Sequence, residues 1–385
     1  MKFLRPLLVG AAALVLAGTA LAQDPIKIGG AFNLTGALAS LDVPAANGAK
    51  LAVKEINAAG GVLGRPLELV VYDGKTDPAT ITNIATQMIS GDHVVAITGF
   101  TDSDSALALG PIAQRNKIPF VTAGATSPLL PTQVGDYMFL EPFGDNVQAA
   151  VGAEFAMKKW GDKAYLLYDK ATEYTNLLAG YFKDAFTHAG GQVLLEDSYK
   201  SGDTSYSAQI TKLKALSTQP DFLYISAMPD DIGTIVKQVR QAGIDLPIVG
   251  GDGYDTPLLV QVAGPASNDV YFTTHALMTM DSTPAVAKFI QAYKAEYGKD
   301  PENAFAALGY DSVHLIANAI TQANSTDPTK IRDALQATKD LPGVTGAISY
   351  VDGQRVPQKQ VTVIGVKDQK LYLAAQEAPS YIPTP

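Results

Sequence analysis

The sequence predicts an α/β protein with two similar parallel sheets, each covered by helices. Short apolar runs alternate with stretches of helical periodicity, and this order occurs in two successive series along the chain. A length of 385 residues is enough for two or three domains with large cores. Apolar residues make up 47% of the chain and charged residues 17%, a balance that is typical of a folded protein.

The first series predicts a parallel sheet. We expect a strand at Ile26–Phe32 and then a helix over Pro44–Ala59, which ends at Gly60-Gly61. The units that follow are Leu67–Tyr72 with Pro78–Ile89, Val94–Thr98 with Ser105–Gln114, and a strand at Ile118–Thr122 before a loop ending at Pro131. Strands that alternate with helices in this way align in parallel, because each helix carries the chain back along one face of the sheet.

The second series repeats the pattern and predicts a second, similar lobe. After a strand at Tyr137–Leu140, its units are Ala164–Tyr168 with helix Tyr174–Ala189, Val193–Leu195 with Tyr206–Leu216, Phe222–Ser226 with Ile232–Ala242, and Ile248-Val249 leading into Gly250-Gly251-Asp252-Gly253. The tail predicts a strand at Val270–Thr274, helices at Ala285–Tyr297, Phe305–Ala323 and Pro328–Ala337, and strands at Ala347–Val351 and Gln360–Val366. This tail must return to both lobes.

The N-terminal segment is typical of a cleaved signal peptide at residues 1–22. Lys2 and Arg5 precede an apolar run, and Ala20-Leu21-Ala22 supplies the small residues that signal peptidase requires. A retained membrane anchor is the alternative, but the run is shorter than the ~20 residues that span a bilayer. We therefore predict an exported protein without direct membrane insertion, located in the periplasm after cleavage near Ala22.

Composition and motifs argue against most enzymes and against nucleic-acid binding. The chain has no cysteine, which excludes disulfides, thiolate metal sites and a cysteine nucleophile. A net charge of −9 disfavours binding to nucleic acid. No phosphate loop, G-x-S-x-G or H-E-x-x-H motif is present, and the histidines stand singly, at His93, His188, His275 and His314. We expect no catalysis, no cofactor and no metal.

Several segments together resemble one known family. They are Lys27-Ile28 with Thr35-Gly36, Gly48 to Gly64 with Glu55-Ile56-Asn57, Tyr72-Asp73 with Asp77-Pro78, Ile118-Pro119 to Thr126-Ser127-Pro128, Tyr174, Asp221-Phe222, Gly250 to Gly253, and Phe305 with Gly309-Tyr310-Asp311. In this order and spacing they resemble the periplasmic leucine/isoleucine/valine-binding proteins, the solute receptors of ABC importers for branched-chain and related amino acids. The resemblance covers nearly all of the mature chain.

The resemblance implies two lobes joined by a three-strand hinge, with the ligand held in the cleft between them. On this pattern lobe 1 comprises residues 24–142 and 277–357, and lobe 2 comprises residues 143–276 and 358–385. Such lobes close on the ligand by a hinge motion. The implied partners are a small-molecule amino acid and a membrane ABC permease, and the implied state is a monomer.

The resemblance also implies where the ends of an amino acid are bound. Ser103 and Thr126 match the hydroxyls that bind the ligand carboxylate, and Gly124 and Ala125 precede Thr126 in the same loop. Asp252 matches an acid that pairs with the ammonium group, to which Gly124 adds its carbonyl. The residues alone leave other roles open: Ser103 as a helix cap, Thr126 as a turn residue, and Asp252 as a residue that orders a glycine turn.

Selectivity for the side chain is implied at Leu41, Tyr174, Met228 and Phe305, although Tyr174 also suits a helix face that packs on the core. Leu41 and Met228 replace residues that are often aromatic in the family. Asp102 and Asp104 flank the carboxylate site; they either stabilise a helix N-terminus from the solvent side or point inward and favour a cationic ligand.

From these residues we predict capture of a zwitterionic amino acid with an aliphatic or aromatic side chain. The alternative keeps the fold and binds a small organic carboxylate or an amine.

Overall fold

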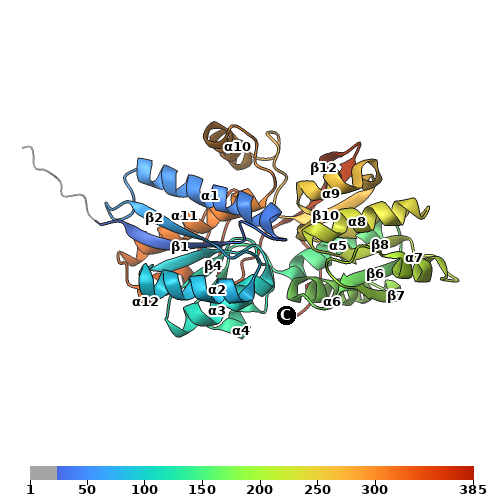
Figure 1. Cartoon of the computed structure of the whole chain (residues 1–385), viewed down its shortest axis with the longest axis horizontal. Coiled ribbons are helices and arrows are strands. Elements are labelled where there is room, and N and C mark those ends of the chain that lie inside the picture. Colours follow the sequence, from blue (N-terminus) through green and yellow to red (C-terminus); the bar gives the residue numbers. More distant parts are fainter. Residues whose placement is uncertain (1–23) are drawn as a thin grey trace, which may run out of the picture.

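Two sheets divide the protein into two lobes that lie side by side (Figure 1). The structure is a computed structural model that describes residues 24–385, so the predicted signal peptide lies outside the described residues. Each lobe is a sheet with helices on both faces, as the two series of strand and helix predict. None of the helices in the described part of the chain has both the length and the apolar character that a membrane span requires.

Lobe 1 is built on a five-stranded parallel sheet with the order β2-β1-β3-β4-β5. The strands are β1 Ile26–Phe32, β2 Leu67–Asp73, β3 Ala96–Gly99, β4 Phe120–Thr122 and β5 Met138–Leu140. The helices are α1 Ala39–Ala58, α2 Pro78–Thr86, α3 Ser103–Arg115, α4 Leu130–Val134, α10 Pro284–Tyr297, α11 Phe305–Ala323 and α12 Pro328–Gln336, with a π turn at Gln87–Gly91.

Lobe 2 is built on a seven-stranded sheet with the order β12-β11-β10-β9-β8-β6-β7. The strands are β6 Lys163–Asp169, β7 Gln192–Tyr199, β8 Phe222–Ser226, β9 Ile248–Gly250, β10 Val270–Thr274, β11 Val361–Lys367 and β12 Lys370–Glu377. The helices are α5 Asp145–Lys159, α6 Glu173–His188, α7 Ser207–Lys214, α8 Pro229–Gln241 and α9 Pro257–Ala263, with 3₁₀ turns at Asp252–Tyr254 and Gly264–Ser267. β11 and β12 are antiparallel additions to an otherwise parallel sheet.

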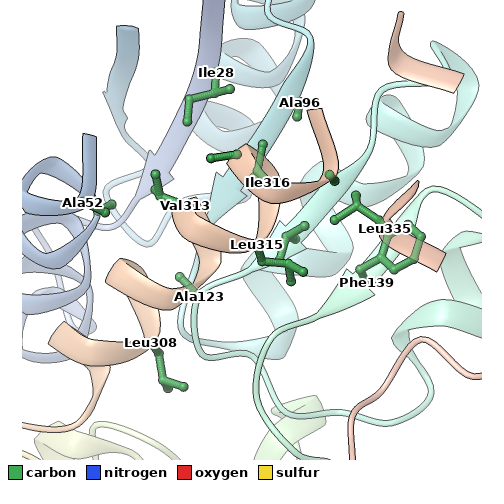
Figure 2. Packing of buried hydrophobic residues seen from close by; sticks show 14 of the residues in the cluster. Ile28, Ala52, Ala96, Ala123, Phe139, Leu308, Val313, Leu315, Ile316 and Leu335 are labelled. Atoms are coloured by element: carbon green, nitrogen blue, oxygen red, sulfur yellow. The ribbon is translucent and has the colours of Figure 1, made fainter. Parts of the chain in front are cut away.

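The largest core of lobe 1 lies between the sheet and the helix pair α1 and α11 (Figure 2). Val313, Leu315 and Ile316 of α11 are fully buried in this core. The two helices pack unusually closely: a Cβ on Gly48 would lie 1.8 Å from the carbonyl oxygen of Ala306. Glycine at this position therefore lets the helix backbones touch, which fixes α11 and the residues at its start against α1.

Several predicted elements differ from those in the structure. α5, α9 and β12 were not predicted, and α4 occupies the end of the segment predicted as a loop. The predicted strand at Ala347–Val351 is absent, since Ile348 makes only an isolated bridge to Leu341. α5 was not predicted from the sequence because 11 of its 15 residues are buried. A helix surrounded by protein lacks the polar stripe that produces a helical period.

Candidate functional site

A narrow cavity lies between the lobes and is lined by residues of both. From lobe 1 it is lined by Leu38, Leu41, Thr101, Asp102 and Phe305. From lobe 2 it is lined by Tyr174, Met228, Pro229, Asp252 and Gly253. Five of the predicted binding residues therefore meet here, namely Leu41, Tyr174, Met228, Asp252 and Phe305. The wall combines apolar side chains with two carboxyl groups, one from each lobe.

A hydrogen bond at the proline of α1 links α1 to the segment before α11, and these two helices carry the apolar wall of lobe 1. Pro44 has no N–H, so it cannot bond to the carbonyl of Ser40 one turn earlier. The side-chain amide of Asn303 donates to that carbonyl instead, at 3.0 Å. Because Asn303 lies just before α11, this bond fixes Phe305 relative to Leu41.

The four residues predicted around the ligand carboxylate are buried but do not line the cavity. Ser103 is the first residue of α3, and its Oγ accepts from the backbone N–H of Ser127 at 3.2 Å. The helix cap is Asp102, so Ser103 is not the cap that the residues alone allowed. Gly124 lies against Phe305, and a Cβ there would be 2.7 Å from that ring.

The remaining two residues of that group, Ala125 and Thr126, lie in the loop after β4. Ala125 donates its N–H to the carbonyl of Phe100 at 3.3 Å. The carbonyl of Thr126 accepts from the N–H of Asp145 at 2.8 Å. This second bond connects the loop of lobe 1 to the first residue of α5 in lobe 2.

Asp252 is held in a buried hydrogen-bond network on the lobe 2 side. The Gln148 side chain donates from Nε2 to Asp252 and to Asp145, at 2.9 Å each. The second carboxylate oxygen of Asp252 lies 3.0 Å from Nε2 of His275. Burial lowers the pKa of His275, although Asp252 opposes the shift, so the ring is neutral at pH 7. It then donates to Asp252 as a neutral partner.

Tyr174 fixes the turn that carries Asp252. Its hydroxyl oxygen accepts from the backbone N–H of Gly253 at 2.9 Å. Tyr174 also lines the cavity, so it belongs to the core of lobe 2 and to the cavity wall together. Met228 enters the wall at the start of α8, where Pro229 follows it at the first helical position.

Asp102 turns inward. Only 6% of the residue is exposed; its Oδ1 accepts from the N–H of Ser105 at 2.8 Å and its Oδ2 from the amide of Asn33 at 3.3 Å. Burial raises the pKa of Asp102 to about 6. Neighbouring Asp42 is fully buried, and burial with repulsion from Asp102 holds its pKa well above the usual value.

Asp104, in contrast, contacts the other lobe at an exposed position. Its two carboxylate oxygens accept from the backbone N–H of Glu173, at 3.2 and 3.1 Å. The Gln133 amide also donates to the Glu173 side chain, at 3.0 Å. A further contact between the lobes joins Asp255 to the N–H of Ala304 at 3.1 Å. The lobes thus touch directly at more than one place.

The chain passes between the lobes three times, after β5, after β10 and before β11. Glu141 follows β5 and Lys359 precedes β11, and the two form an ion pair whose side chains are at most 1% exposed. The Lys359 ammonium also donates to the hydroxyl of Thr345 at 2.9 Å. His275 lies on the second passage, directly after β10, so a residue of this crossover contacts the Asp252 network directly.

The sequence analysis missed Gln148 and Asp145, which connect the loop at Thr126 to Asp252. Both lie on α5, a helix that was not predicted. The sequence signal that could have identified Asp145 and Gln148 is that these two polar residues lie three positions apart in a segment of small apolar residues. Thr101 and Asp42 were also missed. No group of three or more potential metal ligands occurs among the described residues, so the structure provides no positive evidence for a metal centre there.

Comparison with known proteins agrees with this architecture. A family model described as periplasmic binding protein matches residues 25–370. The leucine-, isoleucine-, valine-, threonine- and alanine-binding protein of Pseudomonas aeruginosa is 31% identical over 330 residues, which make up 85% of this chain and 87% of the relative.

Solved structures extend the comparison. The branched-chain amino acid transporter substrate-binding protein of Streptococcus pneumoniae, solved with isoleucine, is 32% identical, with a TM-score of 0.85 over 94% of this chain and 100% of its own. A Rhodopseudomonas palustris solute-binding protein in complex with benzoate shares the fold, with a TM-score of 0.79 at 20% identity over 94% of this chain and 98% of its own. The chain belongs to the periplasmic binding protein family and is a solute-binding protein of ABC transport, not an enzyme.

Proposed function

We propose that the protein captures a zwitterionic amino acid in the cavity between its lobes and presents it to a membrane ABC permease. In this proposal export removes residues 1–22, and the protein works in the periplasm as a monomer. Residues 24–142 with 277–357 and residues 143–276 with 358–385 move as rigid bodies about the hinge. Relatives named for branched-chain amino acids support an amino acid as the ligand.

The observation that carries the proposal is the charge of the cavity wall. The lining has the carboxyl groups of Asp102 and Asp252, and none of the described residues that line it is Lys, Arg or His. A carboxylate wall favours a ligand with an ammonium group, because a buried carboxylate needs a cation or donors. A bare organic carboxylate would be repelled there.

The ends of the ligand divide between the lobes in this proposal. Asp252 binds the ammonium group from lobe 2, together with the carbonyl of Gly124. In this proposal Ser103 and Thr126, which lie buried outside the cavity lining described above, become accessible when the lobes open and bind the carboxylate from lobe 1, where α3 begins and its helix dipole favours a negative charge. A zwitterion that bridges both lobes stabilises the closed state, because only the closed state makes all of these contacts.

The test is a thermal-shift screen of L-amino acids, small organic acids and small amines, followed by calorimetry on the ligands found. Asp252→Asn keeps the size of the side chain and removes its charge. We expect this change to raise the Kd of an amino acid at least tenfold, about 1.4 kcal/mol. Asp245→Asn is the control, since Asp245 is exposed in the loop after α8.

Two outcomes would contradict the proposal. Organic acids or simple amines that shift the melting temperature while amino acids do not would favour the alternative ligand class. An unchanged affinity in the Asp252→Asn protein, with folding intact, would remove Asp252 from the site.

A further inference from the structure

We propose that the cavity selects an amino acid whose side chain carries a hydrogen-bond donor, and that Asp102 and Thr101 receive this donor. This inference rests on the proposed function and deepens it. It narrows the expected side chain from purely apolar to one with a short apolar part and a hydroxyl, amide or ammonium group.

The first argument is the number of acceptors in the wall. A zwitterion has one ammonium group, and Asp252 of lobe 2 is in place to bind it. Asp102 lies in the opposite wall of the same cavity, on lobe 1, and brings a second carboxyl group. With a purely aliphatic side chain, this second carboxyl group would face apolar atoms of the ligand and would lack a donor from it.

The second argument is that Asp102 keeps acceptor capacity. Its contacts with Ser105 and Asn33 use two of the roughly four hydrogen bonds that a carboxylate accepts. Capping α3 does not require a charge, since Asn caps a helix about as well as Asp. The cap therefore does not explain the charge of Asp102, although an amide there could accept only one of the two bonds from Ser105 and Asn33. Burial raises its pKa to about 6, which agrees with a carboxylate that lacks a cationic partner.

The third argument comes from unpartnered polar atoms beside Asp102. Thr101 lines the cavity and is 6% exposed, and its hydroxyl has no hydrogen-bond partner among the described residues. Fully buried Asp42 accepts from the N–H of Thr101 at 3.2 Å through one oxygen, while its other oxygen has no partner within the described chain. Buried polar atoms are nearly always paired, so the unpaired hydroxyl of Thr101 in the cavity wall indicates a polar ligand, whereas Asp42 lies outside the lining.

The apolar lining limits the size of the ligand's side chain. Leu41, Met228 and Phe305 surround the remaining part of the cavity, and the narrow space between them favours a compact side chain. The structure thus describes a mixed pocket, apolar around the stem of a short side chain and acidic at one side of it.

The experiment compares pairs of amino acids that differ mainly in the donor: L-threonine with L-valine, L-asparagine with L-leucine, and L-2,4-diaminobutyrate with L-norvaline. Calorimetry on the full exported chain gives the ratio of Kd values within each pair. We expect the donor-bearing member to bind at least tenfold more tightly in one or more pairs.

Asp102→Asn tests whether Asp102 causes the preference, because the substitution removes the charge and keeps one oxygen to cap α3, with loss of the contact from the Asn33 amide. We expect it to reduce the ratio within the preferred pair at least fivefold, mainly by weakening the donor-bearing ligand. The matched control is Asp327→Asn, because Asp327 caps α12 in the same way at an exposed position. The control should leave the ratio unchanged.

The outcomes separate this inference from the proposed function. Tighter binding of valine, leucine and norvaline than of their partners would overturn the inference and leave the proposed function standing. A donor preference that is unchanged in a folded Asp102→Asn protein would also overturn the inference, since another residue would then accept the hydrogen bond from the ligand's side chain. Failure of every amino acid to bind would overturn both.

Discussion

The hydroxyl of Tyr174 contributes, beside Gln148 and His275, to holding the turn that brings Asp252 to the cavity. Tyr174 lies on the first turn of α6 and Gly253 lies in the turn after β9, and their only direct polar contact is the bond from the N–H of Gly253. Both residues are buried, so no water replaces that bond when it is lost. The position of Asp252 thus depends on a residue 78 positions earlier in the chain.

Tyr174→Phe should destabilise the ligand-free protein by about 1–3 kcal/mol, because the N–H of Gly253 loses its acceptor inside the protein. Denaturant unfolding gives the difference in free energy of unfolding. Tyr381→Phe serves as the comparison, since the hydroxyl of Tyr381 makes a long contact of 3.4 Å to Asp184 at the surface. A Tyr174→Phe protein as stable as the Tyr381→Phe protein would show that the turn relaxes and finds another acceptor.

At the scale of elements, the first turn of α6 meets the opposite lobe. The N-terminal N–H groups of a helix have no partners within the helix, and the dipole there favours negative charge. Asp104 of α3 in lobe 1 provides that negative charge, because both of its carboxylate oxygens accept from the N–H of Glu173 at the start of α6 in lobe 2. This contact lies outside the cavity lining and exists only while the lobes are together. It therefore stabilises the association of the two lobes, and with it the closed state that we propose, independently of the ligand's chemistry.

Asp104→Ala should raise the Kd of every ligand by a similar factor, on the order of two- to tenfold, through faster dissociation with little change in association. Stopped-flow fluorescence measures both rates. Asp230→Ala is a close match, because Asp230 holds the same second position in α8 and makes no contact with the other lobe that the structure records. A slower association rate with unchanged dissociation would mean that Asp104 acts in encounter and not in closure.

At the scale of the whole molecule, the region between the lobes collects buried acids. Burial raises the pKa of Asp102 to about 6 and of Asp255 to about 7, and those of Asp42 and Asp145 well above their usual value. A carboxyl with a raised pKa binds its proton more tightly in the folded state. Its contribution to stability is fully present below the pKa of the unfolded chain and is lost as pH rises through the folded pKa.

The ligand-free protein should therefore be more stable at about pH 5.5 than at about pH 7.5. Burial lowers the pKa values of His275 and His314, and these two groups act in the opposite direction as pH falls through about 6.5. The acids named above outnumber them. Melting temperatures measured across this range test the sign, and Asp255→Asn should reduce the slope. A melting temperature that rises steadily up to pH 7.5 would show that the buried acids stay ionised.

The sequence predicted most of the fold because local patterns report it. The strands Ile26–Phe32, Phe222–Ser226 and Val270–Thr274 have the predicted bounds, since short apolar runs between turn residues form buried parallel strands. Such patterns are weak where burial is complete or where an edge strand is exposed. For that reason α5 and β12, with Leu373 half exposed, were not predicted.

The sequence by itself determined the α/β class, the two lobes, the absence of cysteine chemistry and five residues of the cavity wall. Only the tertiary structure decided that Asp102 faces inward while Asp104 reaches the other lobe. These two residues are neighbours on one helix turn, and their surroundings come from segments some 70 positions away, at Asn33 and Glu173. The direction of a side chain depends on which groups from distant parts of the chain can contact it in the fold. The spacing of residues along the chain does not contain this information.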